Sequence, residues 1–331
     1  MTVNLPAGHT WRHATPADAE LIFGLVSRYN VEVLGHADFT LDEMRDQLVE
    51  PGFDAATGSW LGFTPDGELA GFAWMIGKGT GEEADVEVIA YDPELARWLY
   101  AQVLTRAAEL ARAGGHRSCA VDQGIYRDDT RARAAAAEQG FRPETVFHRM
   151  RVDHGPGTPN PAAPPGLTVH TGPGDEDFLR TAHAVLNESF KDHYGWFPRP
   201  FDDWRQRLDQ ESVFDWPQLT VASLDSRPAA IIMTSDRFIE DENCGYVSDL
   251  GVLPEARGRG IAKYLLRTAF AADSRAGRTG RTGRTGTILH VDTNNVTPAL
   301  GLYESVGMRP VLIIDMWRRH LGNLISTLAS A

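Results

Sequence analysis

The sequence predicts two similar α/β domains in tandem, each with a mixed central sheet flanked by helices. Its 331 residues suit two domains better than one. Residues 153–166, DHGPGTPNPAAPPG, form a Pro- and Gly-rich linker that divides the chain nearly in half. Strand-like and helix-like segments follow in the same order on both sides, without strict alternation. We therefore expect an N-terminal domain at residues 1–152 and a C-terminal domain at residues 167–331.

The N-terminal half begins with a short strand and a helix and continues with a hairpin. The hairpin is predicted at residues 60–75, where apolar runs flank the turn Pro65-Asp66-Gly67. The remaining expected elements are strand 86–90, helix 95–113, strand 119–121, helix 131–139 and strand 145–152.

The C-terminal half repeats this order. Its expected elements are strand 167–170, helix 176–190, hairpin 219–234, strand 246–252, helix 261–272, strand 287–291, helix 298–305 and strand 310–317. Both halves close on a similar tetrapeptide, Gly140-Phe141-Arg142-Pro143 in one and Gly307-Met308-Arg309-Pro310 in the other. These matches indicate a duplicated unit.

Composition narrows the function classes. The net charge of −13 argues against a nucleic-acid surface, because phosphate binding needs a basic face. The two cysteines, Cys119 and Cys244, lie far apart and give neither a disulfide framework nor a zinc spacing. No signal peptide or membrane-spanning run is recognisable. We expect a cytoplasmic protein, monomeric or homodimeric, that binds no metal, nucleic acid or membrane.

A glycine loop follows the β-rich segment at residues 246–252. It reads Arg257-Gly258-Arg259-Gly260-Ile261-Ala262 and opens a predicted helix. Glycines allow positive φ, and the free N–H groups of such a loop and helix start can bind an anion. The two arginines can add charge-assisted bonds to phosphate oxygens. The loop lacks Walker spacing and the third glycine of a dinucleotide fingerprint, so a basic surface turn is the alternative.

The loop resembles the coenzyme A signature of the GCN5-related N-acetyltransferases, [Gln/Arg]-x-x-Gly-x-[Gly/Ala]. Arg257, Gly260 and Ala262 match its fixed positions. Downstream, Asn294-Asn295, Leu302-Tyr303-Glu304 and Gly307-Met308 resemble the second motif of that family. The resemblance implies a tandem protein of this family that transfers an acyl group, most commonly acetyl from acetyl-CoA, directly to the primary amine of a small molecule.

The N-terminal half departs from the family pattern. At the loop position it reads Asp92-Pro93-Glu94 and has no glycine, and Ala136 aligns with Tyr303. We expect this half to be a degenerate copy with a structural role, or a wall of the substrate site. The tandem layout resembles that of mycothiol synthase and related acetyltransferases. The C-terminal half is therefore expected to carry the chemistry.

The resemblance also implies residue roles. The predicted coenzyme ligands are Leu250, Gly251, Val252, Arg257, Gly258, Arg259, Gly260, Ile261, Ala262 and Asn295. We expect a bulge near Leu250-Gly251 that lets two strands splay, and a backbone N–H of Leu250 or Val252 that faces the thioester oxygen. Asn295 could instead cap the following helix.

Proton transfer is assigned to two residues. Tyr303 is the predicted general acid for the leaving thiolate, with packing of its ring in the core as the alternative. Asp249 is the predicted base, with Glu242, Asp241, His193 or a water relay as alternatives. His193 and Tyr194, in an aromatic and polar segment after a helix, are expected to contact the acceptor, unless that segment only packs on the sheet.

Other functions stay open at this stage. The chain could bind acyl-CoA without catalysis, transfer a different acyl group, even from aminoacyl-tRNA, or serve as a two-domain interaction module. The repeat Arg-Thr-Gly at residues 278–286 joins a helix to a strand, and we expect a solvated, flexible loop there.

Overall fold

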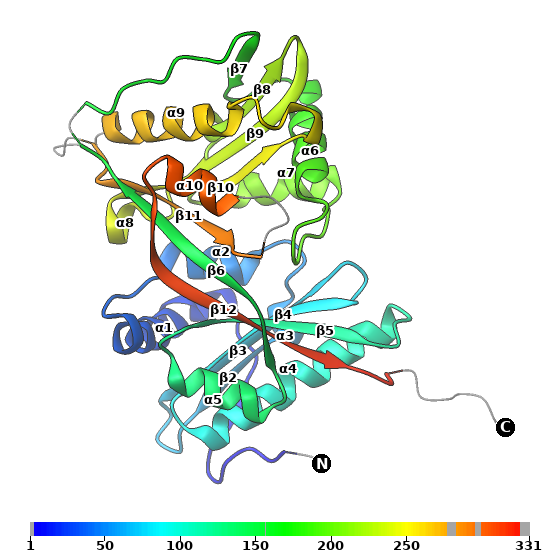
Figure 1. Ribbon diagram of the computed structural model, residues 1–331. Helices are drawn as coiled ribbons and strands as arrows, with labels where there is room; N and C mark the ends of the chain where they lie inside the picture. Colours follow the sequence, from blue (N-terminus) through cyan, green and yellow to red (C-terminus); the bar gives the residue numbers. More distant parts are fainter. Residues whose placement is uncertain (1–2, 156, 277–282, 295–298, 325–331) are drawn as a thin grey trace. The chain divides into compact units, whose positions relative to one another are not determined.

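The computed structural model describes residues 3–155, 157–276, 283–294 and 299–324. The chain divides into two compact units. Unit 1 comprises Met1–Val146 and Ile314–Ala331, and unit 2 comprises Phe147–Ile313. Each unit has a mixed sheet flanked by helices, which confirms the predicted fold class (Figure 1).

The linker does not separate these units. Strand β6 (Arg142–Asp153) precedes the linker, yet its second half pairs antiparallel with β11 (Gly286–Asp292) in unit 2. Strand β12 (Arg309–Leu321) ends the C-terminal half, yet it pairs antiparallel with β5 (Cys119–Tyr126) in unit 1. The compact units thus differ from the boundaries expected at residues 152 and 167. Alternating side chains specify which face of a strand is buried but not which strand is its partner.

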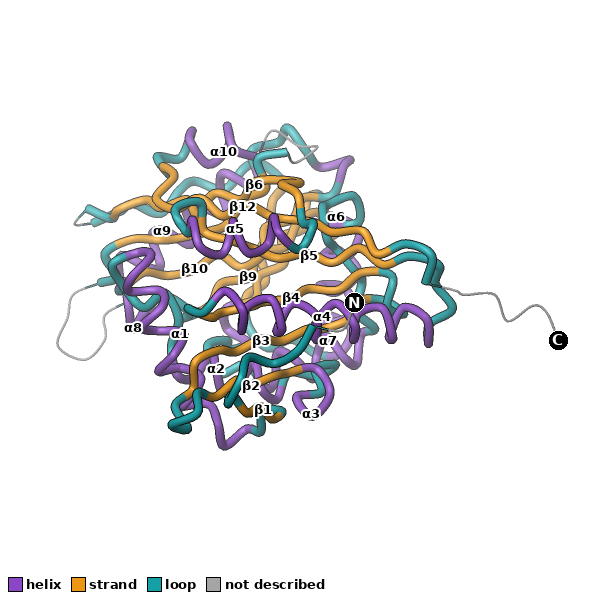
Figure 2. Tube along the Cα trace, turned by 90° about the horizontal axis from the view of Figure 1, so that it is seen from below, coloured by secondary structure: helices purple, strands orange, loops and turns teal. Residues whose placement is uncertain are grey.

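Unit 1 has the strand order β1-β2-β3-β4-β5-β12. The bounds of its remaining strands are β1 Thr10–Arg12, β2 Ser59–Phe63, β3 Leu69–Lys78 and β4 Glu83–Ala90. Its helices are α1 Ala19–Leu34, α2 Leu41–Val49, α3 Ala55–Gly58, α4 Pro93–Ala113 and α5 Thr130–Glu138. Helix α4 runs along β3 and β4 (Figure 2).

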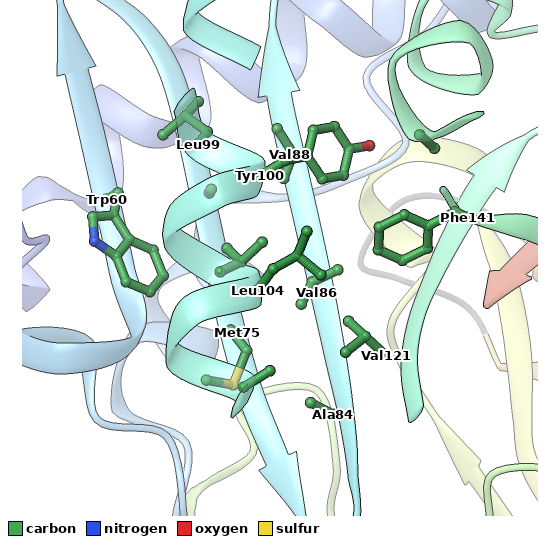
Figure 3. Packing of buried hydrophobic residues seen from close by; sticks show 14 of the residues in the cluster. Trp60, Met75, Ala84, Val86, Val88, Leu99, Tyr100, Leu104, Val121 and Phe141 are labelled. Atoms are coloured by element: carbon green, nitrogen blue, oxygen red, sulfur yellow. The ribbon is translucent and has the colours of Figure 1, made fainter. Parts of the chain in front are cut away.

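The core of unit 1 forms where α4 meets the sheet. Leu99, Tyr100 and Leu104 of α4 pack with Val86 and Val88 of β4 (Figure 3). The Tyr100 hydroxyl is buried and donates to Gln123 Oε1 of β5 at 2.7 Å. Burying these large side chains supplies most of the stabilisation of such a layer, at about 1.5–3 kcal/mol each.

Unit 2 has the strand order β6-β11-β10-β9-β8-β7. The bounds of its remaining strands are β7 Leu167–Thr171, β8 Leu219–Leu224, β9 Arg227–Ser235 and β10 Cys244–Val252. Its helices are α6 Glu176–Phe190, α7 Phe201–Gln210, α8 Ile239–Glu242, α9 Ile261–Arg275 and α10 Ala299–Ser305. Among the helices described, none is long and apolar enough to cross a membrane.

Two apolar clusters cover the two faces of the sheet in unit 2. Helices α9 and α10 pack on one face, against Ile232, Val247 and Leu289. Helices α6 and α7 pack on the other, against Ile231 and Met233. Neighbouring residues of β9 therefore point to opposite faces, as the pleat of a strand requires.

The end of the Arg-Thr-Gly repeat is not a free loop. Residues 278–282 lie outside the described part, but the Arg284 guanidinium is largely buried and donates to Asp273 at 2.6 Å and to Asp236 at 2.8 Å. Thr287 also donates a short hydrogen bond to Asp273, which is buried in α9. A Cβ atom at Gly245 would collide with the Asp273 carboxylate. At this end of the repeat the structure corrects the expectation of a wholly solvated segment.

Replacing Arg284 by Ala should destabilise unit 2 by about 3–5 kcal/mol at neutral pH, because it leaves the buried Asp273 charge without its partner. The loss should shrink in acid, where Asp273 takes up a proton and no longer needs the cation. Arg309→Ala is the control: its ion pair with Asp153 is exposed and should contribute less than about 1 kcal/mol. Denaturant unfolding at two pH values measures both, and equal effects of the two variants would contradict the prediction.

Candidate functional site

Strands β10 and β11 pair in parallel and then separate. Their pairing ends at Val247 opposite Leu289, although β10 continues to Val252 and β11 to Asp292. Beyond that point β10 pairs only with β9, and β11 only with β6. We call the unpaired stretches, 248–252 of β10 and 290–292 of β11, the fork. The splay expected from sequence is therefore present in unit 2 (Figure 1).

A bulge in β10 begins the fork. The register with β9 shifts between Val247 and Asp249, so the extra residue is Ser248. The sequence had led us to expect the bulge near Leu250-Gly251, a little further along the strand. Tyr246 and Asp249 lie opposite Ser235 and Met233, which are two residues apart on β9. Both side chains therefore point to the same face of the sheet, although they are three residues apart in sequence.

The backbone of β10 offers unpaired groups to the fork. Leu253 N–H donates to the Ala229 carbonyl at 2.9 Å. In an antiparallel pair, residues whose backbone groups bond to the neighbouring strand alternate with residues whose groups point away from it. By this alternation the N–H and C=O groups of Leu250 and Val252 point away from β9 and into the fork. The Val252 carbonyl accepts from Arg257 Nε at 3.1 Å. An extended ligand chain could pair with the remaining groups like an added strand.

The predicted coenzyme residues on β10 also pack. The side chains of Leu250 and Val252 pack on the apolar cluster beneath α9 and α10, which we call the α9 cluster. Gly251 is buried against Ser189 of α6, where a Cβ atom would lie 2.6 Å from the serine Cβ. The lack of a side chain at residue 251 is thus explained by the close approach of α6 to β10.

The glycine loop, Arg257 to Ala262, has the backbone of an anion site. Gly258 and Gly260 have φ of 76° and 77°, and Gly260 is the N-cap of α9 without a side-chain cap. The N–H groups of Gly258, Arg259 and Gly260 donate to no acceptor within the described part of the chain. Arg257 and Arg259 are exposed, whereas Ile261 is buried below the loop. Such a loop and helix start favour phosphate oxygens.

Tyr303 lies at the end of α10 and is buried among apolar residues of the α9 cluster. Burial raises its pKa to about 12, and Tyr246 nearby adds to the shift. Its hydroxyl makes no hydrogen bond to another described residue. A phenol in this state keeps its proton until a stronger base reaches it. Asn295 of the second motif lies outside the described residues.

Asp249 lies in the fork, and His193 follows α6; both were predicted as proton acceptors. Burial raises the pKa of Asp249, while Ser248 and Arg207 lower it in part. His193 stacks on Phe190 with ring centroids 4.6 Å apart. Burial and then Arg257 lower the pKa of His193, so its imidazole is neutral near pH 7.

The other candidates for the acceptor side are less well placed. Glu242 is held by Arg151 at 2.7 Å and by Arg149 at 3.6 Å, so its carboxylate is engaged. Asp241 is exposed at the end of α8, and Tyr194 is half-buried beside His193. Among the described residues, no three His, Cys, Asp or Glu side chains converge on a metal position.

One polar array at the base of the fork was missed from sequence. Tyr246 of β10, His290 of β11 and Arg149 of β6 are joined by two hydrogen bonds. We call these three residues the Tyr246 array. They come from three strands that are distant in sequence, and no short motif connects them, so no sequence signal marks them as a group.

Residues 182–308 match the model of the acetyltransferase (GNAT) family. This stretch includes the fork, the glycine loop and Tyr303. This stretch of the chain belongs to the GNAT family. The matched stretch contains the GNAT domain with α9 and the glycine loop, and this family match identifies the protein as an acyltransferase.

Comparison with individual proteins agrees with this GNAT assignment. The chain is 28% identical over 256 residues to a mycothiol acetyltransferase of Nocardia farcinica, covering 74% of this chain and 77% of the relative. Its fold is similar to a GCN5-related N-acetyltransferase from Sphaerobacter thermophilus, with TM-score 0.73, 22% identity and coverage of 96% and 97% of the two chains. It is also similar to a tandem GNAT protein from the clavulanic acid biosynthesis pathway, with TM-score 0.70, 14% identity and coverage of 94% and 98%.

Asp249→Asn should raise thermal stability at neutral pH while lowering turnover. The folded-state pKa of Asp249 is raised, so its stabilising protonated form is present at low pH and is lost as the pH rises through that pKa. Asn removes the cost of burying the Asp249 charge, and the gain in Tm should vanish in acid.

The same variant tests the catalytic role of Asp249. If Asp249 is the base, kcat should fall by about a hundredfold or more. Melting curves across pH, with turnover at neutral pH, test both parts. An unchanged Tm at neutral pH would contradict the buried-charge argument.

Proposed function

We propose that unit 2 transfers the acetyl group of acetyl-CoA to the primary amine of a small molecule by direct attack. The observation that carries this proposal is the order of features along β10. The strand first opens into the fork, then offers the backbone of Leu250 and Val252, and then leads into the glycine loop. A coenzyme with its pyrophosphate at the loop and its pantetheine arm along β10 would bring its thioester to the base of the fork.

Proton transfers follow from the side chains at that point. Asp249, or His193 through water, takes a proton from the ammonium group of the acceptor. The free amine attacks the thioester carbon, the C–N bond forms, and a backbone N–H of Leu250 or Val252 stabilises the oxyanion. The C–S bond then breaks, and Tyr303 gives its proton to the leaving thiolate. The raised pKa of Tyr303 keeps that proton available at neutral pH. The new amide nitrogen still carries one surplus proton, and it passes this proton to the Tyr303 phenolate, directly or through water.

We propose that unit 1 binds no coenzyme A. Its strand β4 also leaves β5 early, since the parallel pairing covers only Glu83–Asp85. The helix that follows, however, starts at Pro93, and the Asp92 carboxylate accepts from Glu94 N–H at 3.0 Å. The start of α4 therefore carries its own anion, and a phosphate there would meet negative charge.

A small-molecule acceptor is supported by chemistry and by relatives. The protein is acidic overall, which attracts a cationic amine. A similar protein is named for mycothiol, and a similar fold belongs to clavulanic acid biosynthesis. His193 and Tyr194 are the side chains proposed to contact the acceptor.

The test has two steps. Coenzyme A and acetyl-CoA should each raise the Tm of the full chain, because a ligand that binds only the folded state stabilises it. Acetyl-CoA with a panel of small amines, peptides and lysine-containing proteins should then release free thiol only with particular amines. No thermal shift with either coenzyme would refute the proposal. A shift without thiol release from any amine would favour a silent acyl-CoA-binding protein, and turnover with peptides alone would refute the small-molecule acceptor.

A further inference from the structure

The Tyr246 array spans the base of the fork. Tyr246 Oη lies 3.0 Å from His290 Nδ1, and Arg149 Nε donates to His290 Nε2 at 3.1 Å. Tyr246 is opposite Ile288 in the last paired stretch of β10 and β11, and His290 is the first residue of β11 beyond that pairing. The array therefore occupies the point where the two strands begin to separate.

Donor and acceptor roles in the array follow from the arginine. A guanidinium can only donate, so His290 Nε2 must be an acceptor. The neutral imidazole then carries its proton on Nδ1 and donates it to Tyr246 Oη. Burial, with Arg149 and Arg237, lowers the pKa of His290 well below its ordinary value, so the ring stays neutral. The protonated form would also place an N–H against that of Arg149.

Arg149 is itself held in place. It is buried, lies 3.6 Å from the Glu242 carboxylate, and stands over the Phe238 ring at 4.6 Å. Glu242 and Phe238 hold the Arg149 guanidinium in place, and Arg149 in turn sets the tautomer of His290. His290 then donates to the Tyr246 hydroxyl oxygen and orients that hydroxyl. The Tyr246 hydroxyl oxygen accepts the hydrogen bond from His290 Nδ1–H. The hydroxyl proton of Tyr246 must therefore point in another direction. No described side chain receives it.

Two observations relate Tyr246 to the proposed reaction centre. Tyr246 shares a face with Asp249 because of the bulge at Ser248. It is also close enough to Tyr303 to raise the pKa of that phenol. Tyr303 comes from the α9 side of the sheet, so the two hydroxyls approach the base of the fork from its two sides. Burial raises the pKa of Tyr246 as well, so it keeps its proton.

We propose that the Tyr246 hydroxyl donates a hydrogen bond to the thioester carbonyl oxygen during acyl transfer, with His290 and Arg149 as positioning residues. This inference rests on the proposed function of unit 2. As the amine nitrogen bonds to the carbonyl carbon, an electron pair moves to the oxygen, and Tyr246 stabilises it while keeping its own proton. When the C–S bond breaks, the pair returns to the carbonyl, and the thiolate takes its proton from Tyr303.

Tyr246→Phe is the first test. Removing one donor to an oxyanion typically costs about 10²–10³-fold in kcat. We expect a loss of this size with every acceptor amine, while the KM for acetyl-CoA, the coenzyme A thermal shift and the pH dependence of kcat/KM stay as in the wild type. Tyr264→Phe is the matched control, since Tyr264 of α9 packs on the same cluster as Tyr303 but lies outside the array.

His290 separates positioning from mere packing. Gln can accept from Arg149 with its carbonyl and donate to Tyr246 with its amide, so His290→Gln should keep most of the activity. His290→Leu can do neither and should lose kcat as Tyr246→Phe does. The double variant Tyr246→Phe/His290→Leu should be no worse than either single variant, because both remove the same bond.

Three outcomes overturn the assignment. An unchanged kcat in Tyr246→Phe, with an active wild type, refutes it alone. In Tyr246→Phe, the acidic limb of the kcat/KM profile could shift while the plateau stays unchanged. This result would show that Tyr246 tunes the pKa of Asp249 and does not bind the carbonyl oxygen. A wild type that binds acetyl-CoA but turns over no amine refutes the proposed function, and this assignment with it.

Discussion

Replacing Tyr303 by Phe is expected to lower kcat by about 10²–10⁴-fold and to leave coenzyme A binding intact. The variant keeps the buried ring and its apolar contacts, so the fold should persist. It loses the only proton that this side chain can give to the leaving thiolate. Thiol release with acetyl-CoA measures kcat, and thermal shift with coenzyme A measures binding.

The size of the Tyr303 effect should depend on the leaving group. A thioester of a more acidic thiol needs less protonation, so it should restore part of the lost rate. Tyr264→Phe again controls for the loss of a phenol in the same cluster. Full activity of Tyr303→Phe would contradict the assignment and leave the ring of Tyr303 with a packing role only.

Gly260→Ala is expected to weaken coenzyme A binding by about tenfold or more. Gly260 has φ of 77°, and an L residue there costs about 1–2 kcal/mol. The loop can relieve this strain only by turning its N–H groups away from the geometry that converges on phosphate. Since 1.4 kcal/mol corresponds to about a tenfold change in affinity, the effect should be visible in titrations.

A matched glycine in unit 1 separates strain from binding. Gly67 has φ of 85°, and an added Cβ would meet nothing within 4 Å at either glycine. Gly67→Ala should therefore lower Tm about as much as Gly260→Ala but leave the coenzyme A affinity unchanged. Equal affinities of the two variants would argue against a phosphate site at the glycine loop.

Local features of the fold were predictable from sequence. Helix α6, residues 176–190, was expected with the observed bounds, and α4 and α9 within a few residues. Periodic apolar positions and caps set such elements locally. Helix α7 was missed because its aromatic residues follow a Gly- and Pro-containing segment that reads as a loop.

Long-range features were not predictable. The exchange of β6 and β12 depends on which strand edge each one meets, and their sequences do not encode this. The bulge was expected two or three residues too late, since β-bulges have no strong sequence signal outside glycine. The Tyr246 array needs three strands in register, so Arg149 could be recognised only in the folded protein.

In the candidate site, too, local features were predictable from sequence and long-range ones were not. The glycine loop was found because its spacing is contiguous, and the structure gives both of its glycines positive φ. Tyr303 was found through a motif and stands near Tyr246. Their functional roles remain predictions, as does that of Asn295.

The exchange of closing strands has a consequence for synthesis of the protein. Strand β12 follows every other strand among the described residues, yet it completes the sheet of unit 1 by pairing with β5. While the ribosome makes residues 127–313, the edge of β5 has no native partner. An unpaired edge is a template for association with other nascent chains. Unit 1, although made first, should therefore finish folding last, and truncations before Ile314 should aggregate rather than yield a free N-terminal domain.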